Sequence, residues 1–263
     1  MQINYERFYL WFNKIFCSLF YLRHQGKTAV VVNAQGGAQF WVRVNTFDLP
    51  VIWEIWNAKV YDDKQYPILE ENVVVDIGAH IGAFAVRAAR LAHRGRVYGY
   101  EASGKNYAWL SKNRELNQLE NLYIENCAIA NQRGEMRLYM PAENGIMGSL
   151  VQNTSSFVET VQTKTLEGII AEHNIQQIDV LKMDVEGAEY DILLGCTPET
   201  LAKVRRIVLE YHDFEADQRS HSDLVSLLIA NGFKVLIEGG MVPQAKWFGT
   251  GIKKVGILKA WRE

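Results

Sequence analysis

The chain has 263 residues, 48% hydrophobic and 22% charged, which is long enough to bury the core of one globular domain. Its 28 basic and 30 acidic side chains give a formal charge of −2 without the positive excess needed for a phosphate backbone, so nucleic acid is excluded as a principal partner. Cys17, Cys127 and Cys196 lie far apart without metal-ligand spacing, which predicts reduced thiols in a cytoplasmic protein.

The first predicted element is an apolar helix over residues 8–22, FYLWFNKIFCSLFYL. Its apolar side chains recur at helical spacing and form one broad stripe: Phe8, Trp11, Phe12, Ile15, Phe16, Leu19 and Leu22. The run is too short to span a bilayer and no small-residue cleavage site follows it, so we expect no transmembrane span. The stripe suits packing on the body of the protein, a homodimer contact, a peripheral membrane contact or a lid over the substrate.

A β-hairpin is predicted at residues 28–44, where two β-branched or aromatic runs flank a Gly-Gly turn. From residue 72 onward, strands alternate with helices. The predicted strands are 72–78, 96–101, 121–130, 178–184, 205–211 and 233–238, and the predicted helices are 81–92, 104–118, 165–174, 188–194 and 220–231. Continuous apolar strands separated by helices indicate a parallel sheet that is covered on both faces. We therefore predict a doubly wound α/β domain over residues 72–263, preceded by a helix and hairpin extension over residues 1–71 that covers the substrate or contacts a dimer partner.

Ligands of such sheets bind beyond the carboxyl ends of the strands. The first strand ends in VVVDIGAHIGAF, where Asp76 closes the apolar run and Gly78 and Gly82 bracket a turn into a helix. Glycine permits positive φ and close approach of a ligand, and the helix offers unpaired N–H groups, although an ordinary strand-to-helix turn is the alternative. A dinucleotide-binding GxGxxG motif would need glycine at positions 80 and 83. His80 and Ala83 stand there, which disfavours an NAD-dependent enzyme.

The next two strand ends are also polar. Glu101 ends the second strand, where a carboxylate accepts hydrogen bonds from both hydroxyls of a ribose; capping of the following helix is the alternative. Asn126, with the backbone at Cys127 and Ala128, lies in the terminal stretch IENCAIAN of the third predicted strand, where an adenine would be bound. Together with the glycine turn, these strand ends indicate a nucleoside-containing cofactor.

Five segments occur in an order that resembles the FkbM family of S-adenosylmethionine-dependent methyltransferases: VVVDIGAHIGAF, VYGYEAS, TKTLEGII, IDVLKMDVEGAEYDILLG and RIVLEYH. The resemblance runs from about residue 43 to about residue 238, and LKMDVEGAE is its most specific part. It implies a class I methyltransferase Rossmann-like sheet of seven strands, the last antiparallel, with S-adenosylmethionine above the first three. Most relatives resemble O-methyltransferases that act on hydroxyls of natural products or sugars. The family more often carries Asn where His80 stands.

Carried over residue by residue, the resemblance implies a cofactor site built from the strand ends. The amino-acid end of the cofactor would be held by Asp76, Gly78, Ala79, His80 and Gly82. The ribose would be held by Glu101 and Ala102, and the adenine by Asn126, Cys127 and Ala128. Asp184, at the end of the fourth strand, would lie near the sulfonium and the acceptor.

The candidate catalytic residues are Asp184, Glu210 and His212. Asp184 and Glu210 end adjacent predicted strands, and His212 follows Glu210 by two residues, so we expect all three to face one cleft. By similarity in fold to catechol-type and macrolide-sugar methyltransferases, Asp184 and Glu210 are candidate ligands of a divalent metal such as magnesium. Without a metal, Asp184 or His212 is the candidate general base, and a core or surface histidine is the alternative for His212. Glu186 and Glu189 are expected mainly to stabilise the start of the next helix.

The acceptor pocket should come from segments outside the common sheet. The candidates are the N-terminal helix and residues 53–63, 143–150 and 238–256. Four of their bulky aromatic side chains either line the acceptor pocket or simply pack: Trp53, Trp56, Trp247 and Phe248. The prediction is an S-adenosylmethionine-dependent O-methyltransferase with a small-molecule hydroxyl acceptor. A catalytically silent methyltransferase-like binding protein and N-methyl transfer are the alternatives.

Overall fold

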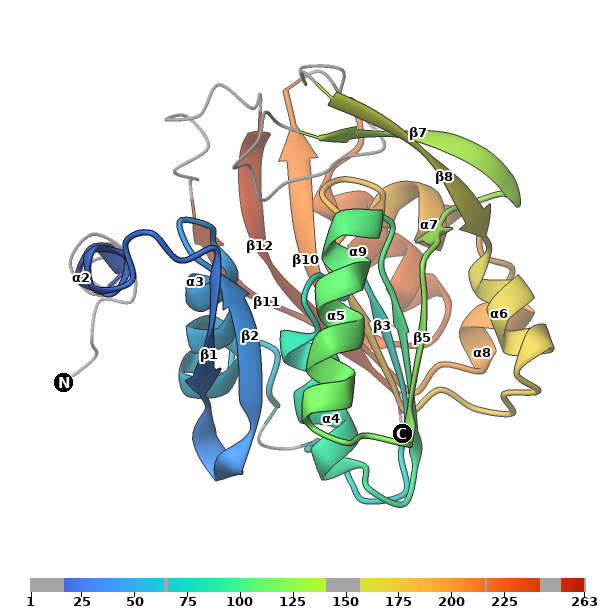
Figure 1. Ribbon diagram of the computed structural model, residues 1–263. Helices are drawn as coiled ribbons and strands as arrows, with labels where there is room; N and C mark the ends of the chain where they lie inside the picture. The colour runs from blue at the N-terminus through green and yellow to red at the C-terminus, as the bar shows by residue number, and fades with distance from the viewer. Residues whose placement is uncertain (1–16, 64–65, 141–156, 216, 242–251, 263) are drawn as a thin grey trace, which may run out of the picture.

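The computed structural model describes residues 17–63, 66–140, 157–215, 217–241 and 252–262. Its centre is a seven-stranded sheet in the order β11-β12-β10-β9-β3-β4-β5 (Figure 1). The strands are β3 Val73–Ile77, β4 Arg96–Tyr100, β5 Leu122–Glu125, β9 Val180–Met183, β10 Arg206–Phe214, β11 Lys234–Met241 and β12 Ile252–Trp261. Only β12 runs antiparallel to its neighbours in this sheet. The predicted doubly wound sheet with an antiparallel last strand is confirmed.

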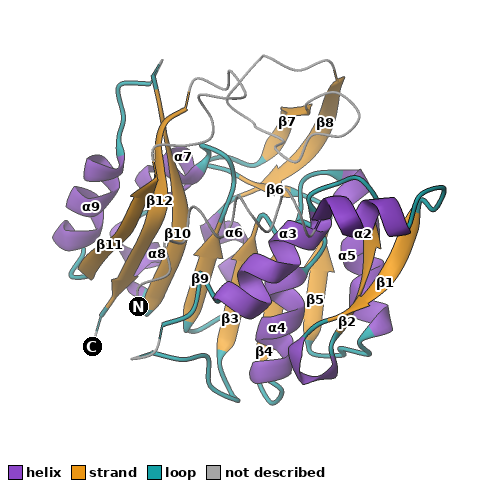
Figure 2. Ribbon diagram, turned by 90° about the vertical axis from the view of Figure 1, so that its left-hand side faces the viewer, coloured by secondary structure: helices purple, strands orange, loops and turns teal. Residues whose placement is uncertain are grey.

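Helices cover both faces of the sheet (Figure 2). One face carries α3 Asp48–Trp53, the π-helical turn η3 Glu54–Ala58, α4 Ala83–Leu91 and α5 Gly104–Leu116; the other carries α6 Leu166–Glu172, α7 Glu189–Leu194, α8 Pro198–Ala202 and α9 His221–Ala230. Alternate residues of a strand divide between the two cores: Val74 is buried on the α4 side, whereas Val75 and Ile77 are buried on the α7 side. This division explains why the central strands are apolar at consecutive positions on both faces, apart from a few polar residues such as Asp76 and Lys182.

The N-terminal extension shares the core on the α4 side. The predicted hairpin forms from β1 Ala29–Asn33 and β2 Gln39–Arg43. Phe40 of β2 and Trp56 of η3 are buried in the same cluster as Phe84 of α4. The division of the chain after residue 71 stays a prediction, but the described part of the extension packs against the sheet as part of one core.

A second, three-stranded sheet is absent from the prediction. It has the order β6-β8-β7, with β6 Ala128–Ile129, β7 Gly134–Met140 and β8 Phe157–Lys164. The single strand predicted over residues 121–130 is therefore wrong, because β5 ends at Glu125 and the chain then enters the small sheet. In Figure 1, β7 and β8 lie at the top, beyond the carboxyl end of β5.

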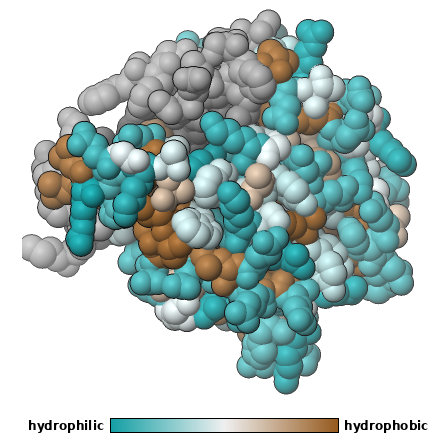
Figure 3. Space-filling model, in the orientation of Figure 1, coloured by the Kyte–Doolittle hydropathy of each residue, from teal (hydrophilic) through white to brown (hydrophobic). Residues whose placement is uncertain are grey.

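Several predicted features lie outside the described residues, namely residues 8–16 of the apolar helix, the segment 143–150, Trp247 and Phe248. The described end of that helix is α2 Ser18–Arg23, where Leu19 and Leu22 are exposed. Apolar side chains show on the surface at this place (Figure 3). No helix in the described ranges combines the length and the apolar character needed to cross a bilayer. The homodimer, the membrane contact and the cytoplasmic location stay predictions.

Candidate active site

A pocket opens at the carboxyl ends of β3, β4 and β9 and beside the small sheet. Its empty volume is about 920 Å³, part of which is open to solvent. The predicted residues that line it are Gly78, Ala79, His80, Glu101, Ala102, Cys127, Ala128 and Asp184. Val51 of α3 and Ile55 of η3 also line it, so the extension contributes apolar wall that the sequence did not assign to the cofactor. The structure thus brings most of the predicted cofactor set to one cavity.

The glycine loop after β3 has the backbone that its sequence predicts. Gly78 and Gly82 have φ of +78° and +89°. A Cβ atom on Gly78 would lie 1.9 Å from the carbonyl oxygen of Asp184, and one on Gly82 would lie 2.6 Å from Leu110 Cδ1. These glycines therefore permit close approach of other parts of the protein, and Gly78 also lines the pocket, so the approach of a ligand to it stays a prediction.

Asp76 does not line the pocket but supports this loop from below. It is fully buried, and its Oδ1 lies 3.0 Å from Lys182 Nζ, which also donates to the carbonyl oxygen of Gly78 at 2.9 Å. Burial raises the pKa of Asp76, and the Lys182 ammonium opposes that shift. Burial alone would lower the pKa of Lys182, but Asp76 and Asp184 outweigh it and the pKa is raised. Sequence reasoning missed Lys182, although a lysine inside the apolar run VLKMD was a usable signal.

Glu101 is held by backbone donors on both of its oxygens. Oε2 accepts from the His80 N–H at 2.7 Å and Oε1 accepts from the Ser103 N–H at 2.9 Å. Burial raises the pKa of this carboxyl group, and the two backbone donors oppose the shift. The capping alternative is wrong, because the side chain that caps α5 is Ser103, which accepts from the Asn106 N–H.

Asn126 is placed differently from its prediction. Its Nδ2 donates to the carbonyl oxygens of Glu101 and Ala102 at 2.8 and 3.0 Å, and the residue does not line the pocket. The amide therefore braces two strand ends, while the neighbouring Cys127 and Ala128 form the pocket wall.

His80 connects the glycine loop to the N-terminal extension. Its φ is +53°, and its Nε2 lies 3.4 Å from Arg43 Nη2 and 3.8 Å from Asp48 Oδ1. Arg43 in turn pairs with Asp48 at 2.6 Å and donates to Asn106 Oδ1 at 2.9 Å. Burial lowers the pKa of His80 to about 4; the Asp48 charge opposes this shift, and the Arg43 charge adds to it.

The predicted acceptor side of the site, at Asp184 and Glu210, joins residues that are far apart in the sequence. Tyr61 donates its hydroxyl hydrogen bond to Asp184 Oδ2 at 3.0 Å and lies 3.2 Å from Glu210 Oε2, so this hydroxyl bridges the two predicted carboxylates. Burial and then the Asp184 charge raise the pKa of Glu210 to about 8 and that of Glu54 to about 7. The predicted juxtaposition of Asp184 and Glu210 is confirmed, whereas Tyr61 and Glu54 were missed as polar members of this group.

His212 is 3% exposed and faces carboxylates at both ring nitrogens. Nδ1 pairs with Glu189, and Nε2 lies 3.3 Å from Glu186 Oε2 and 3.9 Å from Glu210 Oε1. Burial alone would lower the pKa of His212, but Glu186 and Glu189 outweigh it and raise the pKa well above its ordinary value. Glu189 lies in the first turn of α7 as predicted, but the prediction missed that its side chain and that of Glu186 both reach His212.

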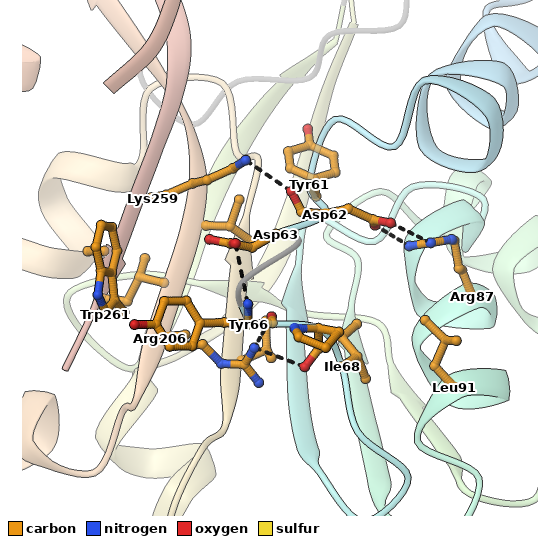
Figure 4. Close-up of a pocket in the computed structure, with 15 residues that line it drawn as sticks. Tyr61, Asp62, Asp63, Tyr66, Ile68, Arg87, Leu91, Arg206, Lys259 and Trp261 are labelled. Carbon is orange, nitrogen blue, oxygen red and sulfur yellow. Dashed lines mark hydrogen bonds and ion pairs between the residues drawn. The ribbon is translucent and has the colours of Figure 1, made fainter. Parts of the chain in front are cut away.

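A second pocket lies near the amino ends of β9 and β10 (Figure 4). Its charged side chains are engaged within the protein: Arg87 pairs with Asp62, Lys259 donates to the Asp62 carbonyl oxygen at 3.0 Å, and Arg206 donates to the Tyr66 carbonyl oxygen. The three cations drawn in Figure 4 therefore already have partners within the protein. For this reason we place the candidate active site in the first pocket.

Comparison with known proteins gives consistent matches. The family model described as the methyltransferase FkbM domain matches residues 76–235. The chain is 26% identical over 244 residues to the 31-O-demethyl-FK506 methyltransferase FkbM of Streptomyces tacrolimicus, covering 81% of this chain and 88% of that protein. It is 28% identical over 161 residues to the 2-O-methyltransferase NoeI of Sinorhizobium fredii, covering 55% and 65%. It is 30% identical over 225 residues to the AMB antimetabolite synthetase AmbE of Pseudomonas aeruginosa, covering 71% of this chain but spanning only 11% of that protein.

Proposed function

The chain belongs to the FkbM methyltransferase family, and from this premise we propose that it transfers a methyl group from S-adenosylmethionine to a hydroxyl oxygen of a small molecule, such as a natural product or a sugar-like acceptor. The observation that carries the proposal is the position of Asp184. It lines the cofactor pocket, and the Tyr61 hydroxyl bridges it to Glu210. A group that can accept a proton therefore lies between the proposed cofactor side and the proposed acceptor side.

The residues of the pocket fit a nucleoside with an amino-acid tail. Glu101 lines the pocket as a carboxylate that its backbone donors hold in place, which suits a pair of ribose hydroxyls. Ile129 and Leu138 add apolar wall from the small sheet, which suits a flat base. The loop at Gly78 lies between Glu101 and Asp184, where the remaining part of the cofactor would be held.

S-adenosylmethionine supplies a methyl group on a sulfonium, which is already a good leaving group. In the proposed reaction, the acceptor oxygen forms a bond to the methyl carbon as the carbon–sulfur bond breaks, and the hydroxyl proton passes to a carboxylate. The chain must therefore position the acceptor in line and accept one proton. Asp184 is the proposed proton acceptor, and Tyr61 orients it together with Glu210.

Two relatives support oxygen rather than nitrogen as the acceptor atom. FkbM is named for a 31-O-demethyl substrate and NoeI for 2-O-methylation. Carboxylates at the acceptor side also agree with an acceptor that donates hydrogen bonds through hydroxyl groups. The activity of AmbE as a whole does not enter the proposal, because the match spans only 11% of that protein.

The test has a binding part and a turnover part. Calorimetry should show binding of S-adenosylmethionine and none of NAD, and a screen of hydroxyl and amine acceptors with labelled cofactor should give a methyl ether by mass spectrometry. Binding without turnover on any acceptor would favour a silent binding protein, and a methylated amine would favour N-methyl transfer.

Asp184→Asn sharpens that test. We expect cofactor affinity to stay within a few-fold of wild type, because the cofactor side is unchanged, and methyl transfer to fall by about 10²–10⁴-fold, because a general base is lost. Glu199→Gln, in an exposed carboxylate at the start of α8, is the control and should leave both quantities unchanged. Full activity of Asp184→Asn would remove Asp184 from the chemistry.

A further inference from the structure

Ligand atoms of three side chains converge at the acceptor side of the pocket. One carboxylate oxygen each of Asp184 and Glu186 and one ring nitrogen of His212 all lie within 4.8 Å of one another. The measured separations from His212 Nε2 are 3.3 Å to Glu186 and 3.9 Å to Glu210. Donors at about 2.1 Å from an octahedral ion are about 3.0 Å apart when adjacent and about 4.2 Å apart when opposite. The separations of His212 from Glu186 and Glu210 fall within this range, and Asp184 brings a further oxygen within 4.8 Å of the Glu186 and His212 donors.

A second observation concerns the far side of the imidazole ring. Glu189 is fully buried and pairs with His212 Nδ1, which turns Nε2 toward the other carboxylates. A carboxylate on the outer nitrogen is the usual support of a metal-ligating histidine. The second oxygen of Glu189 is buried without a hydrogen-bond partner among the described residues. A buried oxygen without a partner is unusual in a folded protein, and a group bound near His212 would account for it.

A second cluster in the chain shows what protein groups do with similar charges. Glu125, Glu172 and His173 converge in the same way, but there the Lys164 ammonium lies 2.7 Å from each of the two carboxylates. That cluster already contains its cation.

The cluster at the acceptor side has no such lysine. Within the described ranges, no lysine or arginine nitrogen lies within 4.0 Å of the carboxylates of Asp184 or Glu210. The nearby Lys182 instead pairs with Asp76 and the carbonyl oxygen of Gly78. His212 lies 3.9 Å from Glu210, and Tyr61 donates to Asp184, so the protein groups described around these two carboxylates are an imidazole and a hydroxyl rather than a directly paired ammonium.

We propose that Asp184, Glu186 and His212 bind a divalent transition-metal ion of the Mn²⁺ or Co²⁺ type, with Glu210 as a further ligand. The imidazole donor distinguishes this site from the two-carboxylate magnesium site expected from the sequence, because Mg²⁺ prefers oxygen donors. Ion binding is independent of methyl transfer. The use of the ion to hold the acceptor hydroxyl beside Asp184 rests on the proposed function.

The test uses the full chain after removal of metal with a chelator, without cofactor or acceptor. Titration with Mn²⁺, followed by calorimetry and by electron paramagnetic resonance, should show a saturable site, and Co²⁺ should give a visible absorption band. Mg²⁺ should bind at least about 10-fold more weakly. Glu186→Gln should weaken Mn²⁺ binding by 10-fold or more, and Glu189→Gln by about 10–100-fold through the histidine. Glu172→Gln, in the cluster that Lys164 fills, is the matched control and should change nothing.

His212→Gln should weaken Mn²⁺ binding and alter the Co²⁺ band, and its thermal unfolding distinguishes loss of a ligand from loss of the fold. Absence of saturable Mn²⁺ and Co²⁺ binding would overturn the proposal, as would binding that Glu186→Gln and Glu189→Gln leave unchanged. Because S-adenosylmethionine binding and turnover are measured separately, failure of the metal site and failure of the proposed methyl transfer are distinguishable.

Discussion

The two sides of the pocket are built in different ways. On the cofactor side, the backbone N–H groups of His80 and Ser103, in the loops after β3 and β4, hold the charged Glu101. The turn at Gly78 depends on the positive φ of that glycine. On the acceptor side, side chains hold one another across long stretches of sequence. Tyr61, for instance, reaches Asp184 and Glu210 over separations of 123 and 149 residues.

This difference has a physical consequence. Backbone donors bring no net charge, so the cofactor side is complete before any ligand arrives. The acceptor side gathers carboxylates with one imidazole, so its charge is balanced only in part by the described protein groups. Such a pocket can bind the same cofactor in every reaction on its cofactor side. The group that binds at the acceptor side then determines the chemistry.

The largest expected effect comes from Lys182, which stands between the two sides. Lys182→Met leaves the fully buried Asp76 without its cation and frees the carbonyl oxygen of Gly78. We expect the free energy of unfolding to fall by about 3–5 kcal/mol, the usual cost of breaking a buried ion pair. Urea denaturation measures the change.

Two further variants identify its cause. Lys182→Met/Asp76→Asn should recover part of the loss, because the uncompensated carboxylate is removed. Lys203→Met, at an exposed lysine, should stay within about 0.5 kcal/mol of wild type. Equal losses in the single and the double variant would show that Asp76 is not the reason.

Glu101→Gln should have the next largest effect, and it is confined to the cofactor side. A glutamine places its NH₂ group against one of the two backbone donors, from His80 or Ser103, and loses the charge that strengthens both bonds. We expect the affinity for S-adenosylmethionine to fall by about 10–100-fold, which corresponds to about 1.5–3 kcal/mol for hydrogen bonds to a charged group. Calorimetry checks this value. Glu210→Gln should leave that affinity within a few-fold, and an equal loss in both variants would contradict the division of the pocket.

The same difference explains how much of the site the sequence could predict. Strand periodicity and strand-end polarity predicted the sheet, the Gly78 turn and the place of Glu101, because these features depend on residues near one another in the chain. Tyr61 lies after an irregular turn with no periodic pattern, and its role appears only when two strands far along the chain are placed beside it.

Local reasoning also left the clearest omission. An acid in the first turn of a helix satisfies the helix dipole, so Glu189 seemed to be explained. Its complete burial against His212 depends on β10, which begins more than a dozen residues later and packs beside this turn. The small β6-β8-β7 sheet was missed for a similar reason, since its strands carry mixed polar sequences and, among the described strands, pair with one another rather than with the central sheet.

The smallest expected effect depends on pH. It concerns His80 of the cofactor loop and its contacts with Arg43 and Asp48 of the N-terminal extension. Burial lowers the pKa of His80 from 6.5 to about 4, so between these values the unfolded chain takes up a proton that the folded protein excludes. The free energy of unfolding should therefore be unaffected above about pH 6.5 and should fall as the pH drops toward 4.

His80→Asn removes this titration and suits the left-handed φ of +53°. Between about pH 7.5 and pH 5, wild type should lose about 2 kcal/mol more than the variant in urea denaturation. His93→Asn, at a side chain that is 55% exposed, is the control. Equal losses in wild type and His80→Asn would show that burial against the extension does not keep His80 neutral. The contacts of His80 with Arg43 and Asp48 would then not hold the extension against the cofactor loop.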